Sequence, residues 1–338
     1  MKALFAYEGN VVVKDDAVPA LQGEDTVLIR TAYSTVSPGT EMTAVRRSKQ
    51  SPLQLGYSAA GVVVQAGVKA ADEFPPGQRV ACYGGPYVRH AEYLAVHKHL
   101  VAPVPDHVSL AEASTAGLGT IAVHAVRQAS LQFGETVVVV GLGILGQIIA
   151  RICRAACLRV IVCDLLPERR KALQGTAGIH VCDGPDEVSR IVADVSGGFG
   201  ADAVLLCASG NQKELLDTSF DWIRDRGKVV IVGDLSMEFT RAKMFKKEAQ
   251  LLISRAGGPG RYDPMYEASG FDYPAGYIRW TEGRNLREYI RLLAGRHIDI
   301  GPLLNRSVSL TEAYSVYGMY KNDPGSILGA VIAYESTN

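Results

Sequence analysis

Short runs of alternating hydrophobic and polar residues fill the first third of the chain. Alternation of this kind, interrupted by Pro and Gly, is typical of strands that bury one face. We expect strands at residues 2–7, 25–33, 60–66, 79–83 and 90–96. This third of the chain therefore predicts a β-rich domain.

From about residue 110 the pattern changes to a helical period, and then to apolar runs that alternate with amphipathic segments. Buried parallel strands separated by helices produce this pattern. We expect the strands at residues 136–140, 159–163, 181–182, 203–207, 228–232 and 250–254. We expect helices at residues 144–156, 186–194, 212–223 and 285–294, and a closing strand at residues 327–334.

The order of these patterns predicts an α/β fold, in which a doubly wound parallel-sheet domain interrupts a β-rich domain. The expected bounds are residues 1–121 plus 264–338 for the β-rich domain and residues 122–263 for the parallel-sheet domain. A chain of 338 residues is long enough for two such domains.

Composition narrows the possible partners. Lys plus Arg and Asp plus Glu both number 35, so the formal net charge is zero, which argues against nucleic acid or an anionic membrane as a partner. No apolar run reaches the ~18 residues of a membrane span and no signal peptide is recognisable, so we expect a cytoplasmic protein. The six cysteines form no C-x-x-C pair, which favours buried free thiols over a metal site.

The most specific motif is the glycine turn GLGILG, with glycines at Gly141, Gly143 and Gly146. It lies between an expected buried strand and an expected helix, which is the context of a dinucleotide-binding turn. The alternative is an α/β unit that needs the glycines only for packing.

The residue that ends the second strand of this unit is Asp164, close to the expected spacing of about 20 residues. A carboxylate here accepts hydrogen bonds from the ribose hydroxyls and repels a 2′-phosphate, so it favours NAD over NADP. Arg169 and Arg170 follow closely and are able to accommodate a phosphate, which leaves NADP as the alternative.

Several segments, taken in order, carry a family resemblance. They are VLIR (27–30), STVSPGTE (34–41), LGYSAAGVV (55–63), PGQRV (76–80), HAEY (90–93), VPD (104–106) and the glycine turn. The chain resembles the medium-chain dehydrogenases/reductases, the alcohol dehydrogenase superfamily, over essentially its whole length. The resemblance implies a GroES-like catalytic domain interrupted by a Rossmann NAD-binding domain, and a homodimer or homotetramer.

Zinc members of this family hold a catalytic metal with a Cys, a His and a third Cys or Glu. The matching positions here are Ser37, Tyr57 and Gly117, and the four-Cys structural-zinc lobe has no counterpart. Zinc requires thiolate, imidazole or carboxylate ligands. The resemblance therefore implies a zinc-independent member with no bound metal.

Further dinucleotide contacts are implied by the resemblance alone. These residues are Thr40, Thr120, Ile144, Leu145, Arg169, Cys207, Ala208, Ser209, Gly233 and Ser254.

The loop at residues 257–282 is similar to a zinc-lacking subgroup related to the dehydrogenase half of sugar-linked, two-domain oxidoreductases. It is dense in groups that hydrogen-bond a polyol or stack on its apolar face. The expected substrate contacts are Tyr262, Asp263, Tyr273, Tyr277, Arg279 and Trp280. The alternative is a loop that packs its tyrosines against the domain interface.

Without zinc, side chains must handle the proton of the reacting hydroxyl. The candidate catalytic residues are Ser37, Glu41, Tyr57 and His90. Tyr57 alternatively only fills the space of the metal, and His90 alternatively only caps a strand.

These features favour a zinc-independent, NAD-dependent dehydrogenase acting on a secondary alcohol, or the corresponding ketone, of a sugar, cyclitol or related polyol. The two alternatives are an NADPH-dependent enone or quinone reductase and a non-catalytic dinucleotide-binding protein.

Overall fold

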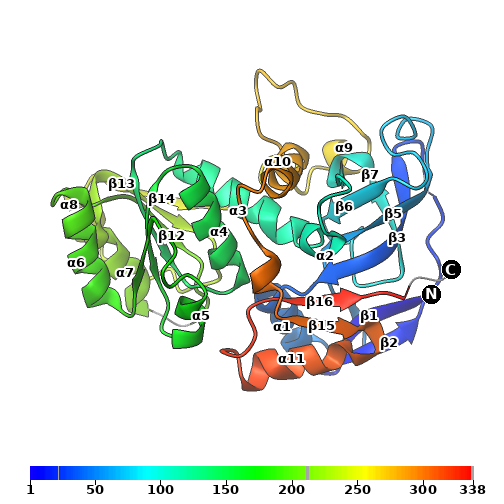
Figure 1. Cartoon of the computed structure of the whole chain (residues 1–338), viewed down its shortest axis with the longest axis horizontal. Helices are drawn as coiled ribbons and strands as arrows, with labels where there is room; N and C mark the ends of the chain where they lie inside the picture. Colours follow the sequence, from blue (N-terminus) through cyan, green and yellow to red (C-terminus); the bar gives the residue numbers. More distant parts are fainter. Residues whose placement is uncertain (22, 211–212, 336–338) are drawn as a thin grey trace. The chain divides into compact units, whose positions relative to one another are not determined.

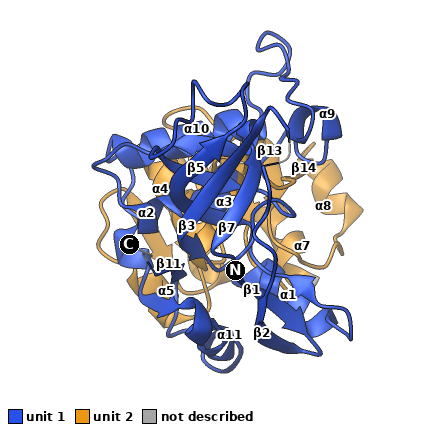
Figure 2. Ribbon diagram, turned by 90° about the vertical axis from the view of Figure 1, so that its right-hand side faces the viewer, with its two compact units in different colours: residues 1–120, 257–338 blue, residues 121–256 orange. Residues whose placement is uncertain are grey.

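The structure is a computed structural model that describes residues 1–21, 23–210 and 213–335. The chain forms two compact units, coloured separately in Figure 2. Unit 1 comprises residues 1–120 and 257–338, and unit 2 comprises residues 121–256. Residues 257–263, which we had expected in the parallel-sheet domain, belong to unit 1.

Unit 1 is built on two sheets, of order β2-β1-β4 and β15-β16-β3-β5-β6-β8, with β7 also paired to β3. Its strands are β1 (Lys2–Tyr7), β2 (Asn10–Asp15), β3 (Thr26–Thr35), β4 (Leu53–Gln54), β5 (Ser58–Ala66), β6 (Arg79–Tyr83), β7 (Tyr93–His97), β8 (Val101–Pro103), β15 (Arg306–Ser309) and β16 (Ala330–Ala333). The pairs are antiparallel except β15 with β16. Antiparallel pairing explains the alternating pattern of the first third.

The strand β3 organises the larger sheet because it pairs with β5, β7 and β16. The pairing with β16 joins Val331 to Thr35, so the last strand of the chain completes the sheet begun by the N-terminal third (Figure 1). Closure of this kind was expected from the strand near the C-terminus, although β16 is shorter than the expected range 327–334.

Helices and helical turns surround these sheets. They are α1 (Pro38–Arg47), η1 (Lys98–Leu100), α2 (Leu110–Ala113), α9 (Pro264–Glu267), α10 (Glu282–Ala294), η2 (Gly301–Leu303), η3 (Leu310–Glu312) and α11 (Ala313–Asn322). The boundary between the units falls within α3 (Ala116–Ala129). The segment between α9 and α10 extends away from the sheets of unit 1 in Figures 1 and 2.

Unit 2 is a parallel six-stranded sheet of order β11-β10-β9-β12-β13-β14. Its elements are β9 (Thr136–Val140), α4 (Ile144–Ala155), β10 (Arg159–Cys163), α5 (Pro167–Lys171), β11 (Ile179–Cys182), α6 (Pro185–Ser196), β12 (Ala201–Leu206), α7 (Lys213–Trp222), β13 (Ile223–Ile231), α8 (Arg241–Lys246) and β14 (Gln250–Ile253). The strand order reverses between β9 and β12, which is the position where open α/β sheets bind ligands.

Side chains of α6 and α7 pack with one face of this sheet, and a buried row on α4 covers the other. Both faces are therefore apolar, and every residue of β9 is buried. The expected α/β fold, a β-rich domain interrupted by a doubly wound parallel-sheet domain, is confirmed.

Local differences from the expectations have local causes. The expected strand at residues 90–96 begins only at Tyr93, because the backbone N–H and C=O of His90 bond Leu55 and Leu4 and do not pair with β3. Helix α10 begins at Glu282 rather than residue 285, because the Thr281 side chain caps it. In the helix expected at residues 212–223, Gln212 lies outside the described residues. All six cysteines are free thiols, but Cys157 is exposed and Cys207 is only partly buried, so the expectation of burial was wrong for these two.

Within the described ranges, no helix is both long enough and apolar enough to cross a membrane.

Candidate functional site

The three glycines of the turn after β9 have different reasons to be glycine. A Cβ on Gly141, which has a φ of +94°, would lie 2.5 Å from the Ala208 nitrogen, and a Cβ on Gly146 would lie 1.8 Å from the Gly141 oxygen. A Cβ on Gly143 would meet no described atom within 4 Å. Packing therefore explains Gly141 and Gly146 but not Gly143, whose open side suits the close approach of a ligand.

Gly143 is also the N-cap residue of α4, so Ile144 and Leu145 begin a helix of 12 residues. The first N–H groups of a helix have no partners within it, and they carry the positive end of its dipole. The turn therefore presents donors and an uncrowded backbone, which fits the pyrophosphate of an NAD(P) dinucleotide.

Asp164 lies at the carboxyl end of β10, next to this turn. Its Oδ2 accepts a hydrogen bond from the Leu142 N–H at 2.6 Å, and its Oδ1 accepts one from the Leu166 N–H at 2.8 Å. Each carboxylate oxygen keeps a further lone pair for a ribose hydroxyl. Arg169 lies 3.6 Å from Oδ2, while Arg170 donates to the backbone oxygens of Asp164 and Leu165.

The other expected cofactor residues of unit 2 lie at the same edge of the sheet, after β12, β13 and β14. Cys207 and Ala208 pack directly against the glycine turn, and a Cβ on Gly233 would lie 2.0 Å from the Ala208 oxygen. The Ser209 hydroxyl accepts only a long hydrogen bond from the Asp234 N–H, at 3.4 Å. The Ser254 hydroxyl is buried and has no partner among the described residues.

Two expected cofactor residues belong to unit 1. Thr120 is fully buried, and its hydroxyl donates to the Ala116 oxygen at 2.6 Å within α3, so burial argues against the ligand contact expected for it. Thr40 is exposed and hydrogen-bonds the side chain of Tyr57.

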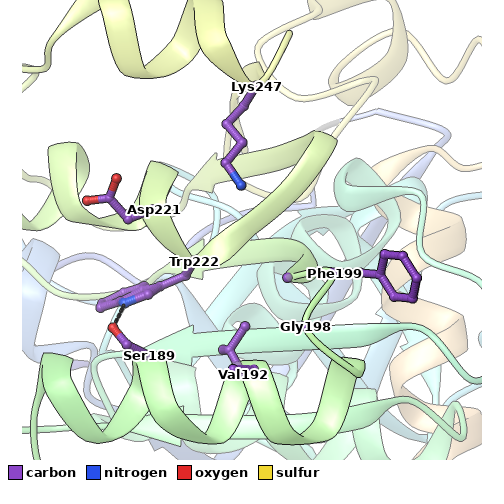
Figure 3. Close-up of a pocket in the computed structure, with 9 residues that line it drawn as sticks. Ser189, Val192, Gly198, Phe199, Asp221, Trp222 and Lys247 are labelled. Atoms are coloured by element: carbon purple, nitrogen blue, oxygen red, sulfur yellow. Dashed lines mark hydrogen bonds between the residues drawn. The ribbon is translucent and has the colours of Figure 1, made fainter.

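A second feature of unit 2 lies at the opposite edge of the sheet. A pocket of about 130 Å³ is lined by Ser189, Val192, Ala193, Gly198, Phe199, Gly200, Asp221, Trp222 and Lys247 (Figure 3). These residues lie on α6 and α7 or in the segments that lead into β12 and β14, so they mark the amino ends of the strands. Ligands of open α/β sheets bind at the carboxyl ends, and the pocket is too small for a dinucleotide.

In unit 1 the structure brings three hydroxyl groups together. The Tyr57 hydroxyl donates to Ser37 Oγ at 2.7 Å, and Thr40 contacts Tyr57 from the first turn of α1. Ser37 is the N-cap residue of α1, and Pro38 favours the start of that helix. The family resemblance matches Ser37 and Tyr57 to two zinc-ligand positions, and in the structure their side chains hydrogen-bond each other.

Beneath these hydroxyls lies a buried polar network centred on Glu41. Glu41 Oε1 accepts a hydrogen bond from the Ser37 N–H at 2.7 Å, and Oε2 lies 3.0 Å from His90 Nε2 and accepts from the Tyr317 hydroxyl. His90 Nδ1 lies 2.7 Å from Ser34 Oγ. With Nε2–H donating to Glu41, Nδ1 accepts from Ser34.

Burial changes the role expected for two of these residues. Glu41 is 2% exposed and His90 is fully buried, so neither side chain is placed to contact a substrate. Our expectation that they act directly is therefore replaced by a supporting role, in which they fix the position of Ser37.

Burial raises the pKa of Tyr57 well above its usual range, and the nearby Glu41 carboxylate adds to the effect. A tyrosine in this state keeps its proton at neutral pH. Tyr57 is therefore suited to donate a hydrogen bond and is not suited to act as a base.

The three positions that the family resemblance matches to zinc ligands, Ser37, Tyr57 and Gly117, also meet here. A Cβ on Gly117 would lie 3.0 Å from the Tyr57 ring and 2.7 Å from Ser58 Cβ, so the tyrosine fills the space beside the glycine. The oxygens of Ser37 and Tyr57 hydrogen-bond each other. In the described part of the chain, no group of three or more His, Cys, Asp or Glu side chains is arranged to hold a metal ion. These residues do not fit zinc.

The expected substrate residues divide into two groups. Asp263 accepts from the Met265 N–H as the cap of α9 and also accepts from the Tyr273 hydroxyl, so both have structural partners. Tyr277 is 90% exposed, and Arg279 stacks on Trp280 in the extended segment. The printed contacts join Asp263 to Tyr273 and Arg279 to Trp280 as separate pairs.

Tyr262 differs from the other five expected substrate residues. Its ring is 61% exposed, stacks on the Arg261 guanidinium and lies within electrostatic range of Tyr57. Sequence reasoning missed the buried residues that hold it, namely Tyr83, Arg261, Glu267 and Glu282. Their only sequence signal was the glycine-rich run before Arg261.

Comparison with known proteins agrees with this geometry. Residues 23–106 match the alcohol dehydrogenase GroES-like domain, and residues 141–269 match the family described as zinc-binding dehydrogenase. A D-xylulose reductase of Morganella morganii is 23% identical over 94% of this chain and 96% of its own length. An L-galactonate-5-dehydrogenase of Escherichia coli (strain K12) is 31% identical over half of each chain.

Among solved structures, galactitol-1-phosphate dehydrogenase from Escherichia coli aligns with a TM-score of 0.81 and 16% identity, over 98% of this chain and all of the other. At this identity the match shows the fold alone. Together, the relatives are sugar and polyol dehydrogenases at low identity.

The different environments of the glycines in this turn predict different effects of substitution, so Gly146→Ala serves as the control for Gly143→Ala. Gly143→Ala should weaken NADH binding at least about tenfold, because the methyl group occupies the ligand side, and should leave the melting temperature within about 1 °C. Gly146→Ala should lower the melting temperature by several degrees, because overpacking costs about 1–3 kcal/mol. NADH fluorescence titration and calorimetry measure both. Unchanged NADH affinity in Gly143→Ala would show that the turn serves packing only.

Proposed function

Because the chain belongs to the medium-chain dehydrogenase/reductase superfamily of alcohol dehydrogenases, we propose a specific activity for it. The protein is an NAD-dependent, zinc-independent dehydrogenase that acts on a secondary alcohol of a sugar, cyclitol or related polyol, or on the corresponding ketone. The observation that carries the proposal is the hydrogen-bonded Ser37–Tyr57 pair at the position of the family's catalytic metal.

The chemistry follows from these hydroxyls. Bound NAD would supply the acceptor for the hydride of the alcohol carbon. The reacting oxygen gains negative charge, which zinc stabilises in related enzymes. In this chain Tyr57 donates to Ser37, which leaves the Ser37 proton available for the reacting oxygen. Glu41 supports the pair by holding the Ser37 backbone N–H.

A polyhydroxylated substrate is supported by two observations. The names of the relatives refer to D-xylulose, L-galactonate and sorbitol. The exposed Tyr262 ring near Tyr57 offers a flat apolar face beside a hydroxyl cluster, which suits the C–H face of a sugar or cyclitol.

NAD is favoured over NADP by Asp164. Its carboxylate is buried at the end of β10 and held by two backbone N–H groups, so its charge stays fixed where the 2′-position of the adenosine ribose would lie. We also propose that Gly141 to Gly146, Asp164 and Gly233 form the dinucleotide site of unit 2.

The direct test is oxidation of a polyol panel with NAD, and reduction of the matching ketones with NADH, before and after treatment with a chelator. We expect the chelated protein to keep its activity and to contain less than about 0.1 zinc per chain by elemental analysis. Activity that is lost on chelation and restored by zinc would reject the metal-free mechanism. Dinucleotide binding without turnover on the whole panel would favour a non-catalytic protein.

The Asp164 carboxylate predicts the cofactor preference. Asp164→Asn removes the charge and keeps an acceptor for the Leu142 N–H but not for the Leu166 N–H, so the fold should be retained with a melting temperature lowered by a few degrees. NADH binding should weaken at least about tenfold, and the ratio of NADPH to NADH affinity should rise by a similar factor. Isothermal titration calorimetry measures both ligands. The exposed Asp186→Asn serves as the control, and an unchanged ratio in Asp164→Asn would contradict the assignment.

The Tyr57 hydroxyl predicts a selective loss of rate. Tyr57→Phe should lower kcat by about 10²–10³, because one donor near the reacting oxygen is lost, and should change KM much less. The melting temperature should stay close to that of the natural chain. Tyr277→Phe, which alters a highly exposed ring, should behave as the unmodified protein. A rate for Tyr57→Phe within threefold of the unmodified protein would show that Tyr57 only fills space.

A further inference from the structure

The strongest feature outside the hydroxyl cluster is a buried pair of carboxyl groups in unit 1. Glu282, at the start of α10, is fully buried, and neither of its carboxyl oxygens has a hydrogen-bond partner among the described residues. Glu267, at the end of α9, is 6% exposed and lies close enough to interact with Glu282 through its side chain. Two adjacent buried carboxylates without a proton between them would repel strongly.

The contacts of Glu267 show which member of the pair holds the proton. Glu267 Oε1 accepts from the Arg261 guanidinium and from the Tyr262 N–H, the latter at 3.0 Å. Glu267 is therefore the carboxylate that balances the charge of Arg261. No described group donates to either Glu282 oxygen, and the side chain lies within interaction range of Glu267. An O–H on Glu282 would therefore have the Glu267 carboxylate as its acceptor.

Burial, followed by the charge of Glu267, raises the pKa of Glu282 to about 9, although Arg261 opposes the change. The titratable or charged groups that face Glu282 come from the segments around it. They are Tyr83, Tyr87, Arg261, Tyr266 and Glu267. Arg261 is the only cation in that set, and Glu267 already pairs with it.

Arg261 connects this pair to the hydroxyl cluster. Its Nη2 donates to the Gly85 backbone oxygen at 2.5 Å, and the neighbouring Gly84 N–H donates to the backbone carbonyl oxygen of Tyr57 at 2.9 Å. The guanidinium also lies over the Tyr262 ring, with 4.3 Å to its centroid. Arg261 therefore contacts Glu267, the turn at Gly85 and the Tyr262 ring, and it links the carboxyl pair to both of the latter.

Tyr262 has a φ of +66°, a conformation that residues other than glycine adopt only when the surroundings enforce it. The enforcing contact is the hydrogen bond from its N–H to Glu267. The ring that this backbone conformation carries is 61% exposed, so the strain is not explained by packing of the ring in the core. We infer that the strained conformation holds the ring in its exposed position.

We propose that Glu267 and Glu282 are positioning residues that share one proton. Together with Arg261 they hold the Tyr262 ring in place, and that ring is the specificity-determining surface of the substrate site. The role of Tyr262 toward a polyol rests on the proposed function. The shared proton and the fixed ring do not, so they can be tested without turnover.

The first experiment compares Glu282→Gln with the unmodified chain. The amide still donates to Glu267 but cannot ionise. Below the ordinary glutamate pKa, Glu282 is protonated in both the folded and the unfolded chain, and the two proteins should melt alike. As the pH rises toward about 9, the unfolded chain loses this proton while the folded chain keeps it, so the unmodified protein loses stability relative to the variant.

We expect Glu282→Gln to melt higher than the unmodified chain by at least about 3 °C at pH 8, with a gap that shrinks toward pH 5. Glu288→Gln makes the same chemical change on the same helix, in a surface pair with Arg291, and should show no such gap. Infrared spectra should show a protonated carboxyl band at pH 7 that is absent only in Glu282→Gln. Equal melting at every pH, or a band that persists in the variant, would overturn the shared proton.

The second experiment follows the ring itself by ¹⁹F NMR of 4-fluorophenylalanine at position 262, a probe that has no phenol proton of its own to titrate. The unmodified chain should give one resonance at pH 7 that shifts or broadens as the pH passes about 9, and Glu282→Gln should keep one resonance throughout. Glu267→Gln should already broaden it at pH 7. If neither Glu282→Gln nor Glu267→Gln changed the position or width of the resonance at any pH, the positioning role would be overturned.

The substrate role is tested separately, with D-xylulose and NADH as the probe. Glu267→Gln should raise KM about tenfold and change kcat less than threefold. The specificity role would be overturned if KM rose tenfold in Glu288→Gln as well. It would also be overturned if Glu267→Gln lost kcat while its KM stayed unchanged. If the unmodified chain does not reduce D-xylulose, the proposed function fails for this substrate, while the melting and NMR results still decide the shared proton and the fixed ring.

Discussion

The Glu41 carboxylate is the interaction on which the candidate site depends. It is buried, yet it has a full set of partners from distant parts of the chain: the Ser37 N–H, His90 and the Tyr317 hydroxyl. A buried carboxylate without such partners would be strongly destabilising. The requirement to satisfy it ties α1, the segment before β7 and α11 into one arrangement, with the Ser37–Tyr57 pair above it.

The same arrangement explains how a chain of this superfamily could manage without the metal. The space beside Gly117 is taken by the Tyr57 ring, and the ligand positions carry hydroxyl groups that hydrogen-bond each other. A tyrosine whose pKa is raised by burial remains a donor at neutral pH. In our proposal of zinc independence, the same two residues, Ser37 and Tyr57, replace metal ligands and supply the pair of hydroxyl donors.

In unit 2 the controlling constraint is the close approach of backbone to backbone. Gly141, Gly146 and Gly233 let three segments at the carboxyl ends of the strands pack without side chains. This packing places the Asp164 carboxylate within 2.6 Å of the Leu142 N–H and leaves Gly143 open. Packing and ligand binding therefore use different glycines of one motif.

The sequence alone determined the fold class, the superfamily and the glycine turn, because these depend on local periodicity and on glycines at fixed spacing. β6, β9 and β10 were predicted at their observed bounds for the same reason. The family resemblance matched Ser37 and Tyr57 to two zinc-ligand positions, and in the structure their side chains hydrogen-bond each other.

Only the tertiary structure decided which polar residues are buried. Glu41 and His90 proved to be buried and in contact with each other, Asp263 and Tyr273 proved to be hydrogen-bond partners, and Glu282 proved to lie near Glu267. Each of these outcomes depends on contacts between residues far apart along the chain or on the path of an irregular loop. Periodicity reports which face of an element is buried, but it does not report which distant side chain a buried polar group will meet.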